Sequence, residues 1–391
     1  MKPALVKPER GFPVAEFEQR TENAQRMMKQ QGLDALLFTT EPNVRYFSGF
    51  FSQFWHSPTR PWYLIVPAAG KPIAIIPSIG EVGMGTTWIE DIRTWPAPQP
   101  DDDGMSLLIQ AMKEQIGQFG KIGMKLGHHS QLRMPAAHFK QLSDALLGTE
   151  VEDCTQLITD LRNVKSDREV AKIEYICQMT SDAFIALQDN MFIGETEREI
   201  CRKMRIDLLQ RGADETPFMV AASGGQSYSD IIMGPLDKAC EEGDILIIDT
   251  GTTYDGYFCD FDRNWAFGSA TDLAKRAYEV TYAATDAGFA AAKPGATCAD
   301  LYNAMSETLI AGGSLGNNIG RVGHGLGIQL TEGPSNTPTD QTVLKPGMVM
   351  TLEPGMEFAP GCQMVHEENI VITEEGARWL TKRAAPELPI V

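Results

Sequence analysis

Four carboxylates and one imidazole in the second half of the sequence have the residue types of a metal site. They follow in the order Asp249, Asp260, His324, Glu353 and Glu367. Carboxylates that converge on one place repel one another unless a cation neutralises them. Oxygen ligands with one imidazole and no thiolate suit Mn, Fe, Co or Zn. Because a single acidic pair usually decorates a solvated strand, the prediction depends on all five side chains meeting.

One probable hairpin would bring the two aspartates together. Asp249 and Asp260 are equidistant from a turn centred on Tyr254-Asp255, which lies between the apolar run 245–248 and the aromatic run 257–261. Cross-strand partners stand about 4.5–5.5 Å apart at Cβ. We therefore expect these two carboxylates to be neighbours on one face of the hairpin.

A second turn, rich in Pro and Gly, relates the two glutamates. Glu353 and Glu367 are equidistant from Pro360, and His324 lies between the two acidic pairs in a Gly-His-Gly run. Five such ligands, with carboxylates able to bridge, could hold two ions roughly 3.5 Å apart and a shared hydroxide. The sequence therefore predicts chemistry in which a polarised carbonyl is attacked by that hydroxide.

These residues resemble the pita-bread metallohydrolases, which include methionine aminopeptidase, proline aminopeptidase, prolidase and the metal-free creatinase. The shared pattern is an Asp at a strand end, a second Asp eleven residues later before an Arg, a Gly-His-Gly run, a Glu before Pro-Gly and a late Glu. Here the Arg is Arg263. The late Glu is Glu367 rather than Glu368, because it precedes Thr373 by six residues as in the family. The resemblance covers residues 155–385 and, more loosely, the N-terminal part.

The resemblance implies an α/β N-terminal creatinase-like domain and an α+β C-terminal pita-bread domain with a curved antiparallel sheet. It implies two divalent metal ions, with manganese first and iron, cobalt or zinc as alternatives. Glu353 and His324 would be catalytic, with Glu353 as proton shuttle, while Asp249 and Glu367 would bridge or chelate the ions. The implied activity is that of an Xaa-Pro dipeptidase or aminopeptidase, in which a metal-bridged hydroxide attacks an amide carbonyl.

The chain departs from the proline-specific peptidases at three positions where they carry polar helpers. The first of those positions falls among Ile231, Ile232 and Met233, and the other two hold Thr331 and Val365. General acid–base groups contribute about 10²–10⁴-fold each to a rate. Their replacement beside a complete metal set favours a non-standard substrate over an inactive protein, and it leaves Thr331 as a substrate-binding candidate.

Two further residues beside the metal set are unusual for the family. Asp262 stands where a Thr is common, and on a strand it should share the face of Asp260. It is then an extra ligand, a charged neighbour of the site or a salt-bridge partner of Arg263. His366 is a candidate for substrate contact, although strand alternation turns it away from Glu367 and favours support from behind.

The segment 51–60 is an aromatic loop that bears on the substrate. It resembles a family loop that reaches over the active site of the partner subunit in a dimer. On that resemblance Trp55, His56 and Arg60 would line the neighbour's site, with Arg60 holding a carboxylate and Trp55 stacking on a cation. The alternative is that the aromatic side chains pack beneath a sheet and Arg60 is solvated.

Three functions remain open from the sequence. The first is the di-metal Xaa-Pro peptidase, which the complete ligand set favours. The second is a superfamily member that acts on a small non-peptide molecule, as an amide hydrolase or as a lyase similar to those that cleave dimethylsulfoniopropionate. The third is a non-catalytic binding protein, which would be expected to have lost ligands.

The elements that must position these residues follow from pattern. Residues 14–32 have helical spacing of apolar residues, and residues 33–38, 62–67 and 72–77 read as buried strands. Ser166 and Glu169 form a capping box at the start of a long helix. The chain of 391 residues predicts two domains, residues 1–158 and residues 159–391.

The composition of the chain excludes some classes of binding partner. The formal net charge of −18 argues against nucleic acid and anionic membranes. The seven scattered cysteines fit reduced thiols in the cytoplasm, and no apolar stretch is long enough to span a bilayer. We expect a cytoplasmic homodimer with a dipeptide or another small-molecule substrate.

Overall fold

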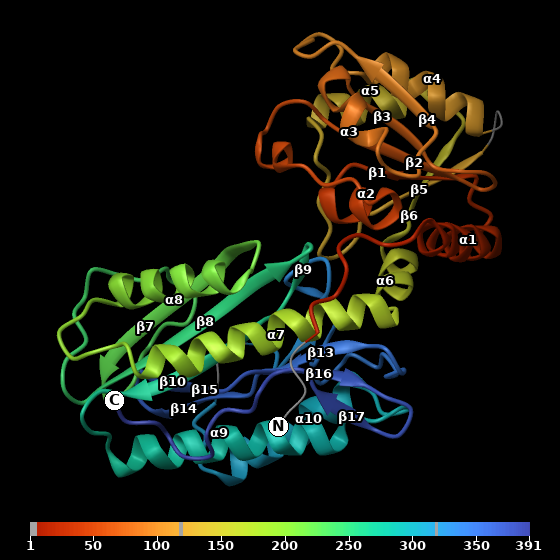
Figure 1. The fold of residues 1–391 in the computed structure, drawn as a ribbon. Coiled ribbons are helices and arrows are strands. Elements are labelled where there is room, and N and C mark those ends of the chain that lie inside the picture. Colours follow the sequence, from red (N-terminus) through yellow and green to blue (C-terminus); the bar gives the residue numbers. More distant parts are fainter. Residues whose placement is uncertain (1–5, 117–119, 317–319) are drawn as a thin grey trace. The chain divides into compact units, whose positions relative to one another are not determined.

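The structure is a computed structural model that describes residues 6–116, 120–316 and 320–391 (Figure 1). The chain forms two compact units, and the first comprises Glu9–Arg162. The second comprises Asn163–Val391 together with the N-terminal segment that ends at Pro8, whose carbonyl accepts a hydrogen bond from Tyr254 Oη at 2.7 Å. The sequence placed the boundary after residue 158 and assigned the N-terminal segment to the first domain.

The first unit is built on a six-stranded mixed sheet in the order β4-β3-β2-β1-β5-β6. Its strands are β1 (Ala35–Phe38), β2 (Tyr63–Pro67), β3 (Ile73–Pro77), β4 (Asp91–Trp95), β5 (Lys121–Met124) and β6 (Glu150–Asp153). Its helices are α1 (Val14–Gln31), α2 (Glu41–Ser48), α3 (Glu81–Met84), α4 (Met105–Gln115), α5 (Ala136–Ala145) and α6 (Thr155–Asn163), with short 3-10 turns at Gln53–His56 and Ser78–Gly80. The central strands β1, β2 and β3 are buried throughout, as their unbroken apolar runs predicted.

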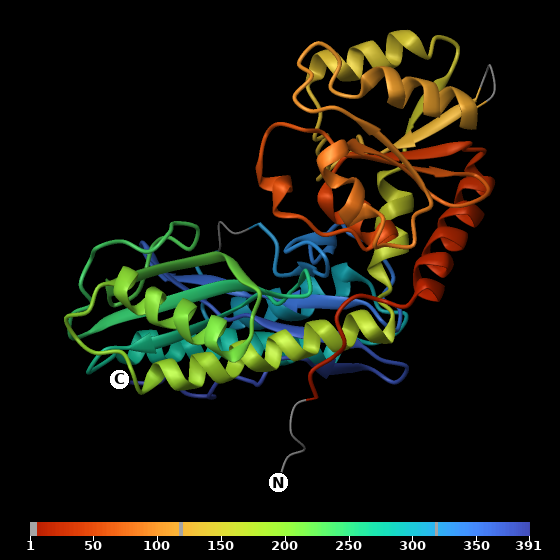
Figure 2. The ribbon, with the colours of Figure 1, turned by 45° about the horizontal axis from the view of Figure 1, so that its top comes forward.

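The second unit contains antiparallel strands between two pairs of helices. The strands are β7 (Glu215–Gly225), β8 (Asp244–Tyr254), β9 (Tyr257–Phe258), β10 (Phe261–Ala266), β11 (His324–Gly325), β12 (Glu332–Ser335), β13 (Val349–Leu352), β14 (Gly355–Ala359), β15 (Cys362–Val365), β16 (Glu368–Ile372) and β17 (Ala377–Trp379). The helices are α7 (Asp167–Gln188), α8 (Glu197–Arg211), α9 (Asp272–Ala291) and α10 (Cys298–Ala311). Helices α7 and α8 cover one side of the strands and α9 and α10 the other (Figures 1 and 2).

The strands of the second unit form separate ladders that meet at the acidic residues. One sheet has the order β10-β8-β7 with β9 paired to β8, a second has the order β12-β11-β13-β16-β17, and β14 pairs with β15. The predicted capping box is present, because Ser166 Oγ accepts from Glu169 N–H while the Glu169 carboxylate accepts from Ser166 N–H. It begins the 22-residue helix α7, which packs along β8 and β9.

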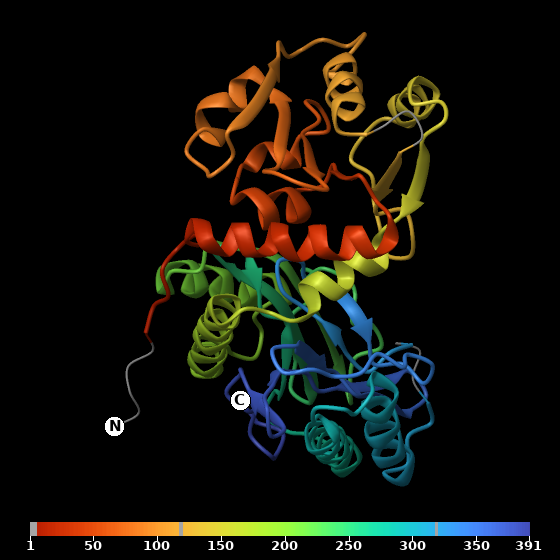
Figure 3. The same cartoon turned by 90° about the vertical axis from the view of Figure 1, so that its right-hand side faces the viewer.

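Apolar packing between strands and helices fixes the second unit. A buried cluster joins Ile245 and Ile247 of β8 to Met350 and Leu352 of β13 and to Met305 of α10. Figure 3 shows α9 and α10 side by side against the C-terminal strands. Among the described residues no helix is long and apolar enough to cross a membrane. All seven cysteines are free thiols, and six of them are buried.

Candidate metal centre

The first hairpin forms with a different register from the one that the sequence suggested. Residues Asp255 and Gly256 are the two central turn residues, both with positive φ (49° and 74°), as a type I′ turn requires. Asp249 is therefore opposite Asp262 rather than Asp260. The expectation that Asp249 and Asp260 are direct cross-strand partners was wrong because the turn lies one residue further on. The offset between the pairs is even, so Asp260 keeps the same face and lies diagonal to Asp249.

The second hairpin has the predicted register. Gly355 pairs with Val365, and His366 N–H donates to Pro354 O at 3.2 Å. Continued by one residue on each side, this register puts Glu353 opposite Glu367. The two ladders thus deliver their carboxylates from independent pairs of strands.

Three of the predicted ligands converge closely. Asp260, His324 and Glu367 are all buried, and each offers one ligand atom within 4.8 Å of the others. His324 Nε2 lies 3.4 Å from Asp260 Oδ2. Asp249 and Glu353 lie close enough to interact with this group. Burial raises the pKa of Asp249 most, and the charges of Asp260 and Glu353 raise it further.

The imidazole of His324 is held in a defined orientation. Its Nδ1 lies 2.8 Å from the carbonyl of Gly325, and its backbone N–H donates to Thr351 Oγ1 at 2.9 Å. When Nδ1 donates its proton to that carbonyl, Nε2 is the ring nitrogen left to bind a metal ion. Gly323 makes this approach possible, because its φ is +143° and a Cβ there would lie 2.2 Å from Asn336 Nδ2 and from Thr351 O.

The electrostatics of the cluster favour the binding of a cation. Burial, followed by neighbouring carboxylates, raises the pKa values of Asp249 and Glu367 well above their ordinary range. Burial also raises the pKa of Asp260, although its hydrogen bond with His324 opposes this. Burial disfavours protonation of His324, but Glu353 and Asp260 outweigh it and raise the pKa of the imidazole. The acidic side chains are thus poorly stabilised as anions.

Orphaned oxygens support the same conclusion. Asp249 Oδ1 and Glu367 Oε1 are buried without a hydrogen-bond partner among the described residues. Unpaired buried carboxylate oxygens are costly, and oxygen ligands with one imidazole suit divalent first-row metals. The residues present therefore fit the metal ions that the sequence predicted.

Asp262 belongs to the same buried region. Its Oδ1 accepts the backbone N–H of Glu367 at 3.2 Å, while its Oδ2 is buried without a partner. The alternative of a side-chain salt bridge to Arg263 is not realised, because the guanidinium of Arg263 pairs instead with Glu368 at 3.0 Å. Asp262 therefore orients Glu367, and a role as an extra ligand remains a prediction.

Two residues near the centre were not found from the sequence. Arg321 Nε lies 3.2 Å from Glu353 Oε1, and its Nη2 approaches Thr331 Oγ1 at 3.5 Å. Asn369 Oδ1 accepts the backbone N–H of Asp260 at 3.0 Å, and its Nδ2 donates to Asp260 O. The sequence offers one signal that Arg321 lies near the centre, which is its position three residues before His324.

His366 lies against α9 rather than among the carboxylates. Its Nδ1 is 3.1 Å from Thr285 Oγ1, and its ring meets the edges of Tyr278 and Tyr282. Burial, with Arg383 and Arg263 nearby, lowers its pKa well below the ordinary value, so the imidazole is neutral. These contacts do not support the suggested contact with substrate, and they agree with support from behind, as strand alternation favoured.

The aromatic loop has Trp55 at its base. Trp55 is 8% exposed, packs 5.8 Å from Trp62 and lies beneath the guanidinium of Arg133 at 5.2 Å. It is therefore an anchor of the loop, in agreement with the alternative in which the aromatic side chains pack beneath a sheet. His56 is exposed, and Arg60 is partly exposed over the ring of Phe54 at 5.4 Å.

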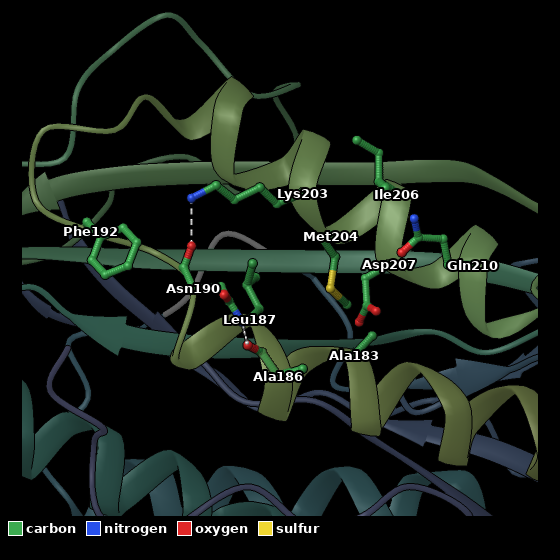
Figure 4. A pocket seen from close by; sticks show the side chains of 10 residues that line it. All are labelled: Ala183, Ala186, Leu187, Asn190, Phe192, Lys203, Met204, Ile206, Asp207 and Gln210. Carbon is green, nitrogen blue, oxygen red and sulfur yellow. Dashed lines mark hydrogen bonds between the residues drawn. The ribbon is translucent and has the colours of Figure 1, made fainter.

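A separate pocket lies between α7 and α8 and has a cavity volume of about 390 Å³ (Figure 4). Leu187, Met204 and Ile206 supply apolar walls, and Lys203 Nζ donates to the carbonyl of Asn190 at 2.6 Å. None of the clustered acidic residues lines it, so the chemistry of the metal centre does not belong to this pocket.

Known proteins share these features. A model of metallopeptidase family M24 matches residues 171–375, and one of the creatinase/prolidase N-terminal domain matches residues 20–164. The Xaa-Pro dipeptidase of Pyrococcus furiosus is 28% identical over 94% of this chain and 98% of that protein. A Bacillus subtilis protein, uncharacterized peptidase YqhT, is 29% identical over 93% of this chain and 97% of its own length. The structure of dipeptidase PepE from Mycobacterium ulcerans has a TM-score of 0.85 at 26% identity, covering 97% of this chain and 99% of that chain. These matches confirm the predicted two-domain fold.

Proposed function

The chain belongs to metallopeptidase family M24 and is a metal-dependent hydrolase, and on that premise we propose that it is a di-metal dipeptidase acting on Xaa-Pro dipeptides. The observation that carries this proposal is the convergence of Asp260, His324 and Glu367 on one buried spot. The similar Xaa-Pro dipeptidase and dipeptidase PepE support the choice of a dipeptide substrate.

Five residues would hold the ions: Asp249, Asp260, His324, Glu353 and Glu367. Bound divalent ions supply a Lewis acid for the carbonyl and a nucleophilic water at neutral pH. His324 contributes by keeping Nε2 as an acceptor through its contact with Gly325 O. Asp262 and Asn369 contribute by fixing the backbone of Glu367 and Asp260.

Glu353 is proposed to move the proton that peptide hydrolysis requires. Its carboxylate is partly exposed, in contrast to the buried carboxylates of Asp260 and Glu367. Arg321 holds Oε1 at 3.2 Å from Nε and so fixes the direction of the carboxylate. A carboxylate fixed in this way can accept a proton from the attacking water and deliver it to the leaving nitrogen.

The finer features of the proposal rest on the sequence. We propose manganese as the first choice of metal, with iron, cobalt and zinc as alternatives, because the ligand set contains no thiolate. A cytoplasmic location is supported by the seven free thiols. A homodimer is proposed from the resemblance of segment 51–60 to the family loop that reaches a partner.

A second candidate is a small non-peptide substrate, cleaved as an amide or by lyase chemistry. It is favoured by the apolar or small side chains of Ile231, Thr331 and Val365, where proline-specific relatives carry polar helpers. The metal requirement is the same in both cases, so only the substrate distinguishes them.

The test combines metal content with turnover. Elemental analysis of chelator-free protein should find about two ions per chain, and Xaa-Pro dipeptides should be cleaved faster with added Mn²⁺. Asp260→Asn should lose metal and activity together. The matched control is Asp286→Asn, which changes an exposed carboxylate on α9 that pairs with Arg383. This variant should keep its metal and its activity. Metal with no dipeptide cleavage would favour the small non-peptide substrate, and absence of metal would refute the metal centre.

A further inference from the structure

Two arginines adjoin the metal centre, and they differ in how many acceptors they have. Arg263 donates to the carbonyls of Asp262, Glu367 and Lys382 and pairs with Glu368. Its side chain is 10% exposed. Arg263 is thus enclosed by acceptors from its own unit and has a structural function.

Arg321 is placed differently. Its side chain is 29% exposed, and Nε donates to Glu353 Oε1. The only other described acceptor at bonding distance is Thr331 Oγ1, which lies 3.5 Å from Nη2, the outer limit of a hydrogen bond. A guanidinium carries five N–H donors, so the edge formed by Nη1 and Nη2 keeps donors for a further acceptor.

That open edge has the geometry of a carboxylate site. The two parallel N–H groups of a guanidinium edge match both oxygens of a carboxylate, and such charge-assisted pairs are the strong ones. A guanidinium at this position attracts a substrate anion, which the neighbouring carboxylate of Glu353 would repel. Arg321 Nε also contacts Glu353, the proposed proton carrier, so the guanidinium lies beside a reacting group.

We propose that Arg321 binds the C-terminal carboxylate of the substrate and thereby selects free dipeptides over amidated or longer peptides. This inference rests on the proposed dipeptidase function and adds the determinant of substrate length. Glu353 and Thr331 orient the guanidinium by accepting from Nε and Nη2. A peptide that continues beyond the second residue has no carboxylate at this position and loses the paired contact.

The kinetic test compares a free dipeptide with its amide. Arg321→Met should lower kcat/KM for an Xaa-Pro dipeptide roughly 10- to 100-fold, mainly through KM, because charge-assisted hydrogen bonds to the substrate are lost. Loss of the contact with Glu353 should lower kcat on the dipeptide and on its amide equally, whereas KM should rise for the dipeptide alone. Arg321→Lys should recover part of that rise in KM. The control Arg378→Met, an exposed arginine paired with Glu174, should change neither value. Equal losses on acid and amide, carried by kcat, would overturn the assignment and indicate that Arg321 acts only through Glu353.

A binding test separates this inference from the dipeptidase proposal. L-proline and L-alanine, each compared with its amide, are titrated calorimetrically into metal-loaded wild type and Arg321→Met of equal metal content. The wild type should bind each acid at least about 10-fold more tightly than its amide, and the variant should lose that preference. Binding of the acids through metal alone would be equal in both proteins and would overturn the role of Arg321. Failure of the wild type to cleave any Xaa-Pro dipeptide would refute the proposed function, while the titration would still decide the role of Arg321.

Discussion

Burial is the first cause of the raised pKa values of Asp249, Asp260 and Glu367, and repulsion by neighbouring carboxylates is the second cause for Asp249 and Glu367. In the metal-free protein these carboxylates bind protons more tightly when folded than when unfolded. The folded state then holds more protons, so stability falls as pH rises from the unfolded pKa near 4 toward the higher folded pKa. The raised pKa of His324 acts in the same direction.

The first prediction follows from this sign. In chelator-treated protein, Glu367→Gln removes one buried charge and should raise Tm relative to wild type by a few degrees, on the order of 2–4 °C per kcal/mol. The difference should grow as pH increases from about 4 to 7, because Glu367 of the unfolded wild type releases its proton near its ordinary pKa, whereas burial in the folded state raises the pKa and opposes that release. Thermal melts at several pH values measure it. Parallel curves for the two proteins would contradict the electrostatic argument.

A second prediction concerns the ligands themselves. His324→Ala should abolish metal uptake and activity while leaving far-UV circular dichroism close to that of wild type, because the ring contacts mainly the carboxylates and Gly325 O. Loss of groups that only support a ligand costs about 10–100-fold in metal affinity, so loss of a ligand should exceed that range. Full metal content in this variant would remove His324 from the site.

At the scale of the elements, Asn369 joins β16 to the loop that carries Asp260. Its amide bonds both the N–H and the carbonyl of Asp260, and Cys177 Sγ on α7 lies 3.2 Å from the same Oδ1. Asn369 therefore does for this residue what a neighbouring strand would do, because Asp260 falls between β9 and β10. It positions the ligand without offering one.

The third prediction tests that positioning. Asn369→Ala should weaken metal binding roughly 10- to 100-fold, the usual effect of removing a group that orients a ligand. Chelator competition measures the affinity. Thr180→Val is the matched control, since it removes the buried contact to Cys259 Sγ at 3.4 Å without touching Asp260. If both variants weakened binding equally, general loosening between α7 and the strands would explain the effect.

The two hairpins show what sequence reasoning can reach. The Pro360 turn gave the right register for Glu353 and Glu367, whereas the first register was wrong because a turn with positive φ at Asp255 and Gly256 takes precedence over symmetry. An Asp-Gly pair between two strands is a readable signal for that turn. Residue type and strand alternation therefore predict which face of a hairpin a side chain occupies, while turn geometry decides which residue is its cross-strand partner.

Contacts between segments far apart in the sequence could not be predicted, because no local turn relates them. Arg321 meets Glu353 across 32 residues, and Asn369 meets Asp260 across 109. No periodicity connects such positions in one sequence. The family resemblance also could not reveal them, since it names only the residues that match its pattern. The sequence left two roles open for Trp55, because an aromatic run does not show which ring faces inward.

At the scale of the whole molecule, the proposed dimer gives the first unit the function of presenting the loop 51–60 to a partner. Contacts within the first unit can hold that loop in shape. Arg133 organises the loop 51–60 from below, because its guanidinium donates to the carbonyls of Ser57 and Thr59 and covers Trp55. Burial lowers the pKa of Arg133, so the carbonyls and the ring must stabilise a partly desolvated charge. The loop is thus held in one shape within its own unit.

The last prediction uses this support to test the reach of the loop. Arg133→Ala should loosen the loop and, if the loop of one copy lines the site of its partner, reduce kcat/KM by up to about 100-fold. Metal content and the dimer measured by light scattering should not change, because Arg133 contacts none of the proposed metal ligands. Arg93→Ala removes a guanidinium paired with Asp91 and Glu114 in the same unit and is the control. Faster proteolysis of the loop in Arg133→Ala with unaltered kinetics would mean that the loop does not take part in the site of either copy.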